Sequence, residues 1–218
     1  MTDSSDNSEY QNKSEEYRKD LLLEMYRQMF NDINRHIVVI WQSVGVLLGA
    51  FTLFALVQKQ IIPVDIASAL LVLIAAWLIA HIYDASYWYN RNLVIIANVE
   101  RQFLRPEDLR EIHYYFGGHR KTSAMLTHLK IQWYFGIGIA ALVLAYHFAT
   151  RVLPVWSWEV WTIGLQRLLP YLVLLASIVF LGLLRGSRIK SYENFIENSP
   201  GRDINAQGVR YGSGHPTA

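Results

Sequence analysis

The chain has 218 residues, of which 52% are hydrophobic and only 17% are charged, and its formal net charge is +2. An average soluble domain carries about 25% charged residues, so this composition excludes a disordered chain and argues against an ordinary soluble one. The small net charge gives no indication of nucleic acid as a partner, and the absence of cysteine excludes disulfides, Cys-ligated metals and a cysteine nucleophile.

The first 36 residues are polar or amphipathic. Residues 1–14 show no hydrophobic periodicity, and we predict a disordered tail there. Residues 15–36 carry apolar side chains at helical spacing and are predicted to form a helix that continues into the first apolar segment. The first 36 residues hold eight acidic and five basic residues, which makes an anionic membrane surface a poor partner for the apolar face of this helix. We therefore expect that face to pack against protein.

Four apolar segments follow. A helix that crosses a bilayer needs about 20 mostly apolar residues. The segments cover residues 37–57, 66–83, 131–150 and 168–184. A soluble helical core is the alternative, but four such segments would leave almost no polar face in a chain of this length. The sequence predicts an all-α integral membrane protein, with four transmembrane helices and helical cytoplasmic extensions forming one domain over residues 15–197.

Lys and Arg are unevenly distributed between the connections. Of the 20 Lys and Arg residues, 17 lie in residues 1–36, 84–130 and 185–218, and three lie in the two remaining connections. Cytoplasmic loops are enriched in Lys and Arg. We therefore predict a multi-pass protein of the plasma (inner) membrane, with both termini and the long central connection in the cytoplasm.

The central connection begins with a predicted helix over residues 84–104. This segment contains neither Gly nor Pro, so it should continue the second span into the cytoplasm. Its apolar rows leave the membrane on the same side as those of residues 15–36. We expect the two segments to pack against each other as a coiled-coil-like antiparallel pair.

The remaining cytoplasmic segments follow from their helix-breaking residues. A proline ends the preceding helix and opens a short predicted helix over residues 106–116, which stops at the glycine pair 117–118. Thr122 or Ser123 is expected to cap the helix that enters the third span. Residues 198–218 are rich in Gly, Pro, Ser and Asn, and we predict a second disordered tail.

A polar stripe on the second helix is the candidate functional site. The spacing of His81, Asp84, Arg91 and Asn98 places them on one side of the helix. Asp84 lies at the predicted inner membrane boundary, where an ionisable group is costly unless it is paired or hydrated. One hypothesis is a gate or an ion station at the mouth of the bundle. The alternative is a boundary carboxylate neutralised by a nearby cation, with Asn98 bonding to another helix.

Small residues recur four apart in several spans and are candidates for helix packing. The predicted packing residues are Gly45, Gly49, Ala141, Ala145, Gly182 and Gly186. Such spacing allows two helix backbones to approach closely. Packing within one chain and association between copies both remain open interpretations.

No enzyme motif is present, and we predict no catalytic residue, metal or cofactor. The chain lacks a phosphate-binding loop, a G-x-G-x-x-G sequence, a nucleophile elbow and a zinc-binding H-E-x-x-H. His113, His119 and His128 lie within 16 residues, but no acidic or thiol partner stands at ligand spacing.

Two functions therefore remain as hypotheses. The first is a self-associating protein that acts on membrane permeability as a small oligomeric pore or effector. The second is a structural or accessory subunit that recruits another membrane or cytoplasmic protein through its cytoplasmic helices. In helix count and layout, the predicted architecture resembles small four-span proteins whose helical extensions cap a membrane bundle. Some of those proteins act as membrane effectors and others as accessory subunits.

Overall fold

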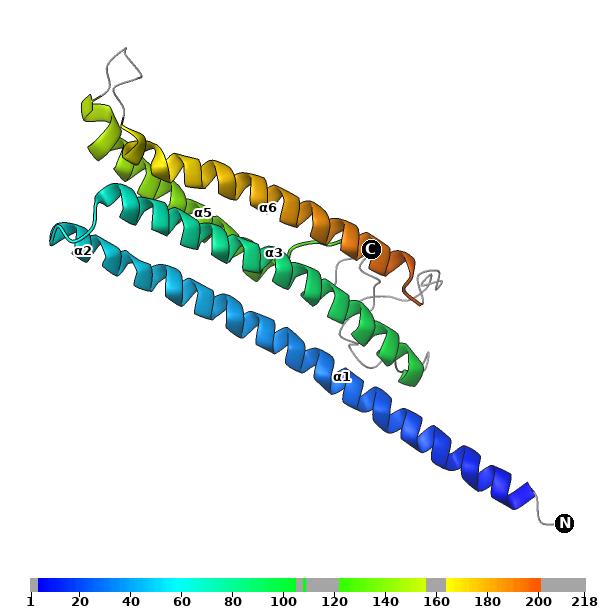
Figure 1. Cartoon of the computed structure of the whole chain (residues 1–218). Helices are drawn as coiled ribbons and strands as arrows, with labels where there is room; N and C mark the ends of the chain where they lie inside the picture. Colours follow the sequence, from blue (N-terminus) through cyan, green and yellow to red (C-terminus); the bar gives the residue numbers. More distant parts are fainter. Residues whose placement is uncertain (1–3, 105–107, 109–121, 156–163, 201–218) are drawn as a thin grey trace.

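A computed structural model of the chain describes residues 4–104, 108, 122–155 and 164–200, with side chains from residue 11 onward. This described part contains helices and no β-strand (Figure 1). The elements are α1 (Ser4–Gly49), η1 (Ala50–Thr52), α2 (Leu53–Gln58), α3 (Val64–Phe103), α5 (Thr127–His147), η2 (Phe148–Val152), η3 (Leu153–Val155) and α6 (Leu165–Glu197). The prediction of an all-helical chain is confirmed over these residues.

Among the described residues, four helical runs are long and apolar enough to cross a membrane. They cover Gln11–Gln58, Val64–Phe103, Thr127–Val155 and Leu165–Glu197, and each contains one of the four predicted apolar segments. The first run includes α1, η1 and α2, after which the chain turns at Gln60, a residue with a φ of 58° in the left-handed region. Pro63 then precedes α3 as its N-cap. Proline suits this position because its ring fixes φ near the helical value and its missing N–H has no helical partner to lose.

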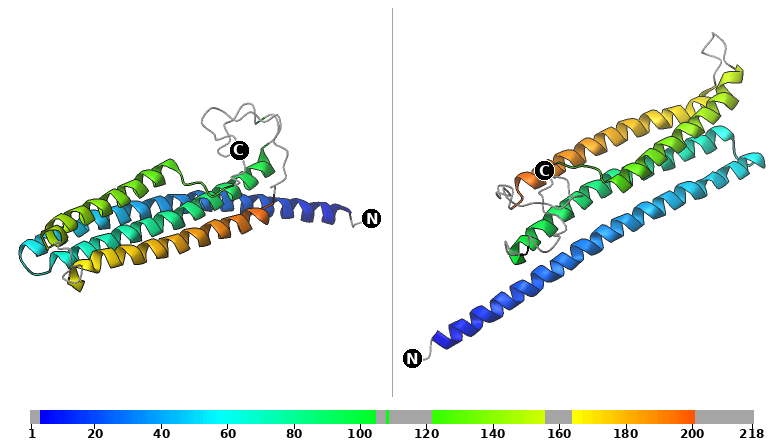
Figure 2. Two further views of the ribbon diagram at one scale, coloured as in Figure 1. Left: turned by 90° about the horizontal axis from the view of Figure 1, so that it is seen from above. Right: turned by 180° about the vertical axis from the view of Figure 1, so that it is seen from behind.

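Helix α3 is the centre of the structure. It packs against α1, α5 and α6, whereas these three make their main contacts with α3 (Figures 1 and 2). Half of the apolar stretch of α3 is buried, against 22% in the first and third runs and 11% in α6. The three outer helices therefore leave most of their apolar surface for lipid or for other chains.

The contact between α1 and α3 extends along both predicted regions. In the apolar part, Leu47 packs in one cluster with Leu78 and Ile82. Farther along, Ile33 packs with Leu93 and Ile96, in the expected antiparallel contact between residues 15–36 and 84–104.

Polar contacts extend this pairing, and beyond them α1 continues without a covering helix from the described residues. The Tyr26 hydroxyl donates a hydrogen bond of 3.1 Å to Glu100, and Arg18 donates one of 3.2 Å to Gln102. Tyr17 and Leu21, on either side of Arg18, are 73% and 63% exposed where this pairing ends. The apolar face of the N-terminal helix is therefore only partly covered by the described part of the chain.

Two local predictions differ from the structure. Residues 4–14 are helical rather than a disordered tail, because the segment contains no Gly or Pro to interrupt the helix that α1 continues. Helix α5 begins at Thr127, and its N-cap position is Leu126, not Thr122 or Ser123. The preceding turn is held against α3 instead, where the Asn90 side chain donates a 3.0 Å hydrogen bond to the carbonyl of Ala124.

Several predicted segments lie outside the described residues. They are the short helix over 106–116, except for Asp108, and the C-terminal tail beyond residue 200. The expected prolongation of the fourth span is observed, since α6 continues to Glu197.

Candidate functional site

The structure does not join the four residues of the predicted polar stripe into one site. Asp84 forms an ion pair with Arg188 of α6, and both side chains are 34% exposed. The rings of His81 and Trp77 are nearly perpendicular, with centroids 4.6 Å apart. Asn98 accepts a 3.4 Å hydrogen bond from Arg101 on the same helix. The Asp84 carboxylate is thus neutralised by a cation, as expected from the alternative to a gate or an ion station. That cation comes from α6.

Arg91 makes contacts of a different kind. Its guanidinium lies 5.1 Å from the ring centroid of Trp88 and 5.5 Å from that of Phe195 on α6. Cations at such distances are attracted to the negative face of an aromatic ring. The pairs Asp84–Arg188 and Arg91–Phe195 advance by seven residues on both helices, so these two residues of the stripe form part of the packing between α3 and α6.

The predicted glycine pairs do not pack within the chain. A Cβ placed on Gly45, Gly49, Gly182 or Gly186 would meet nothing within 4 Å. Ala141 and Ala145 are likewise exposed. These positions therefore present open surface on α1, α5 and α6. Association between copies remains a prediction.

A buried polar cluster, which was not predicted from the sequence, connects the helices at the end of the bundle opposite the polar stripe. Asp65 and His147 are fully buried, and Asp65 Oδ1 lies 2.8 Å from His147 Nε2. Arg151 donates two hydrogen bonds to the same carboxylate, 3.1 Å from Nε to Oδ1 and 3.0 Å from Nη2 to Oδ2. On its other side, His147 Nδ1 lies 3.2 Å from the Tyr171 hydroxyl.

Local structure explains why these groups meet. Asp65 stands in the first turn of α3, where the positive end of the helix dipole stabilises a carboxylate. His147 ends α5, and Arg151 follows four residues later in the π-helical turn η2, so both side chains can reach one acceptor. An ionised carboxylate only accepts hydrogen bonds, so His147 Nε2 carries the proton that faces Asp65.

The contacts of this cluster hold neighbouring helices together. Both oxygens of Asp65 are occupied, and the contacts connect α3 to α5, to η2 and, through Tyr171, to α6. Bidentate guanidinium–carboxylate pairs are strong and geometrically specific. We interpret the cluster as the fastening of three helices at the end of the bundle opposite the polar stripe.

This cluster was not predicted because its charged residues lie just outside the predicted membrane spans. Asp65 and Arg151 each stand one residue outside a predicted span, 66–83 and 131–150, so they were assigned to the connections. The spacing of four between His147 and Arg151, together with an acid at the start of the second span, is the signal that could have revealed it. In the part of the chain that the structure describes, no three His, Asp or Glu residues are grouped to hold a metal ion.

Over the described residues, fold and site together define a class: a helical protein with four helices suited to cross a membrane, built around α3 and fastened at one end by ion pairing to the buried carboxylate of Asp65. No protein-family model matches the chain, and neither a curated protein nor a solved structure is significantly similar to it.

Proposed function

We propose that this chain is a non-enzymatic protein of the plasma (inner) membrane that self-associates through an outward face of α1, and that the assembly alters membrane permeability. The observation that carries the proposal is the composition of this face. Gln42, Gly45, Gly49 and Thr52 follow one another at steps of three, four and three residues, and all four are exposed. We call these four residues the outward face of α1.

The outward face of α1 combines two features that drive helix association in lipid. Its glycines leave open space in which a second backbone can approach closely. Within the described residues the side-chain amide of Gln42 has no hydrogen-bond partner. An amide that faces hydrocarbon without a partner is unfavourable, so pairing with an amide on a second α1 would stabilise the assembly.

An effect on permeability requires more than one copy. Between α1 and α3 the described interior is filled by apolar side chains such as Ile40, Leu47 and Leu78, so this contact offers no passage within one chain. A ring of copies joined through α1 would bring the polar Gln42 and Thr52 side chains together. With four spans per chain, such a pore is expected to need several copies.

The test combines native mass spectrometry with dye release from liposomes that contain the purified full-length protein. We expect a closed oligomer and dye release for the unchanged chain. Gly45→Leu should dissociate the oligomer and abolish release, because the new side chain fills the space for the second backbone. Gly138→Leu is the matched control, since this glycine of α5 also has open space around it but lies on another helix. A monomeric unchanged chain that releases no dye would refute the proposal.

An accessory role is the second candidate, and the overhang of α1 favours it. Tyr17 and Leu21 leave an apolar strip that the described part of the chain does not cover. A cytoplasmic partner helix would bury this strip. In that case the protein purified from its own membranes should carry a second protein in fixed ratio, and a Tyr17→Ser, Leu21→Ser double variant should lose it. Retention of the partner by the double variant would count against this role.

A further inference from the structure

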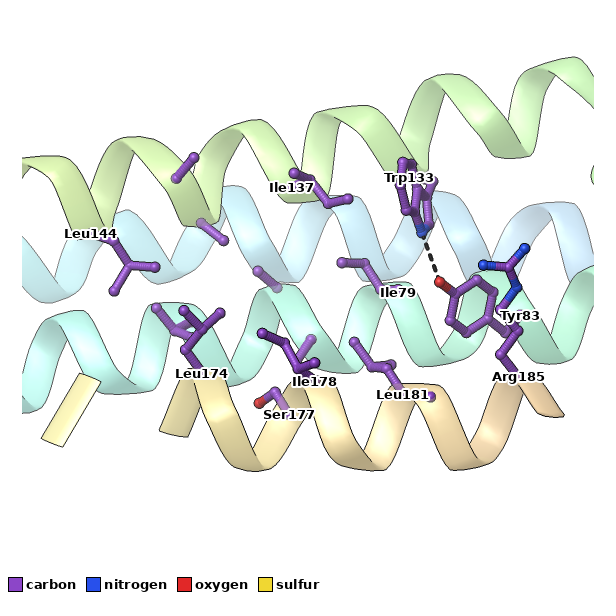
Figure 3. Close-up of a pocket in the computed structure, with 16 residues that line it drawn as sticks. Ile79, Tyr83, Trp133, Ile137, Leu144, Leu174, Ser177, Ile178, Leu181 and Arg185 are labelled. Carbon is purple, nitrogen blue, oxygen red and sulfur yellow. Dashed lines mark hydrogen bonds between the residues drawn. The ribbon is translucent and has the colours of Figure 1, made fainter. Parts of the chain in front are cut away.

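A separate apolar groove runs along the side of the molecule that α1 does not touch. It has a volume of about 500 Å³ and is lined by α3, α5 and α6 (Figure 3). Small side chains on the three helices, among them Ala75, Ala141 and Gly182, create the space. Volumes of this size are typical of sites for small molecules. None of the residues of the outward face of α1 takes part.

The length of the groove matches one leaflet of a bilayer. Its lining spans Val72–Tyr83 on α3, Trp133–Leu144 on α5 and Leu174–Arg185 on α6. Each stretch advances eleven residues, which corresponds to about 16 Å of helix. The hydrocarbon core of a bilayer is about 30 Å thick, so the groove covers about half of it.

One end of the groove is polar and the other is apolar. Tyr83, Trp133 and Arg185 lie at the predicted cytoplasmic boundary, where the Trp133 indole N–H donates a 3.1 Å hydrogen bond to the Tyr83 hydroxyl (Figure 3). The opposite end, near the predicted middle of the membrane, is formed by aliphatic residues such as Leu144 and Leu174. This is the polarity of a lipid that lies parallel to the helices with its headgroup at the cytoplasmic surface.

The charge at the polar end favours an anionic headgroup. The Arg185 guanidinium lies 6.0 Å from the Tyr83 ring centroid and forms no ion pair with any carboxylate of the described residues. Lys130 stands one helical turn before Trp133 and is exposed and unpaired within the same part of the chain. The neighbouring Arg188, in contrast, is already neutralised by Asp84.

We propose that this groove binds an acyl chain of an anionic phospholipid from the cytoplasmic leaflet, with the lipid phosphate held at Arg185. The charge at the polar end favours this occupant over a helix of a second copy, because Arg185 has no carboxylate partner among the described residues and a lipid phosphate would supply the anion. An extended hydrocarbon chain, with carbon contacts at about 4 Å, can lie along the aliphatic lining between Leu174 and Tyr83.

The experiment is native mass spectrometry of the full-length protein in detergent, titrated with phosphatidylglycerol or with phosphatidylcholine of the same chain length. The unchanged protein should retain phosphatidylglycerol in preference to phosphatidylcholine. Arg185→Gln should lower this preference about fivefold, the effect expected from one basic residue at a membrane surface. Arg167→Gln is the matched control, because it removes the same charge from the opposite end of α6.

A second pair of variants tests the apolar part of the groove. Gly182→Leu should lower the retention of both lipids at least fivefold, since its side chain enters the groove, whereas Gly138→Leu should not. Ala141→Leu fills the same space from α5 and replaces Gly182→Leu if that variant does not fold. Equal retention of the two lipids by the unchanged protein, or retained lipid in the filled variants, would overturn the proposal. A change in oligomeric state instead of lipid retention would assign the groove to a second copy.

Discussion

Replacing Asp65 with Asn tests whether the buried cluster fastens the bundle. The substitution preserves the size of the side chain and removes its charge, which leaves the Arg151 guanidinium without its anion and weakens the contact with His147. Breaking a buried ion pair by removing one partner costs about 3–5 kcal/mol. The Arg151 side chain is 37% exposed and can turn toward the membrane surface, so we expect the lower end, about 3 kcal/mol.

Thermal unfolding of the purified protein in detergent, followed by tryptophan fluorescence, measures this loss. For a chain of this length each kcal/mol lowers the Tm by about 2–4 °C, so Asp65→Asn should lower it by about 6–12 °C. Asp84→Asn provides the control on the same helix. Its partner is also an arginine, but both side chains are one-third exposed, and such pairs contribute about 0–1 kcal/mol.

The Tm values of the two variants show whether burial of the Asp65 cluster is the source of its stability. If Asp84→Asn lowers the Tm as much as Asp65→Asn, burial of the Asp65 cluster is not the source of its stability. The double variant Asp65→Asn, Arg151→Gln gives a further check, because it removes the unpaired charge. It should be more stable than the sum of the two single losses predicts. Strict additivity would show that the two groups do not act together.

Three further predictions follow from other contacts. Gly136→Leu should destabilise the protein by about 1–3 kcal/mol in the same assay, because its Cβ would already lie 3.4 Å from the Leu78 side chain, while Gly138→Leu should have little effect. Tyr171→Phe should cost about 1 kcal/mol through the lost contact with the buried imidazole, and an unchanged Tm would contradict that role. The cysteine-free chain also permits single-cysteine labelling: Lys59→Cys should react with a membrane-impermeant maleimide outside intact cells and Lys190→Cys only after permeabilisation, and the reverse pattern would invert the predicted topology.

Hydrophobic periodicity in the sequence was sufficient to predict the helices and one of the contacts between them. The pairing of Ile33 with Leu93 and Ile96 could be predicted because the two amphipathic segments were expected to leave the membrane on the same side, and each needs a cover for its apolar face.

The partners of the polar residues could not be predicted from periodicity. Spacing shows which residues share a face but not which helix that face meets, so the pairing of Asp84 with Arg188, 104 positions away, was not foreseen. The cluster of Asp65 with His147 and Arg151 depends on the same kind of distant pairing, between the start of α3 and the end of α5. It also depends on charges that stand just beyond the apolar segments, where a hydropathy criterion assigns them to the connections.

The length of α1 has a mechanical consequence. From the predicted membrane boundary at Ile37 to Ser4, the helix runs without interruption for 33 residues, a rise of about 50 Å (Figures 1 and 2). Helix α3 braces only the part nearest the boundary, up to the contact of Arg18 with Gln102. The remainder, from Tyr17 to Ser4, projects beyond this contact as one continuous helix. A rotation of α1 would therefore be transmitted through the exposed Tyr17 and Leu21, which lie where the contact with α3 ends, to the N-terminal end of the helix.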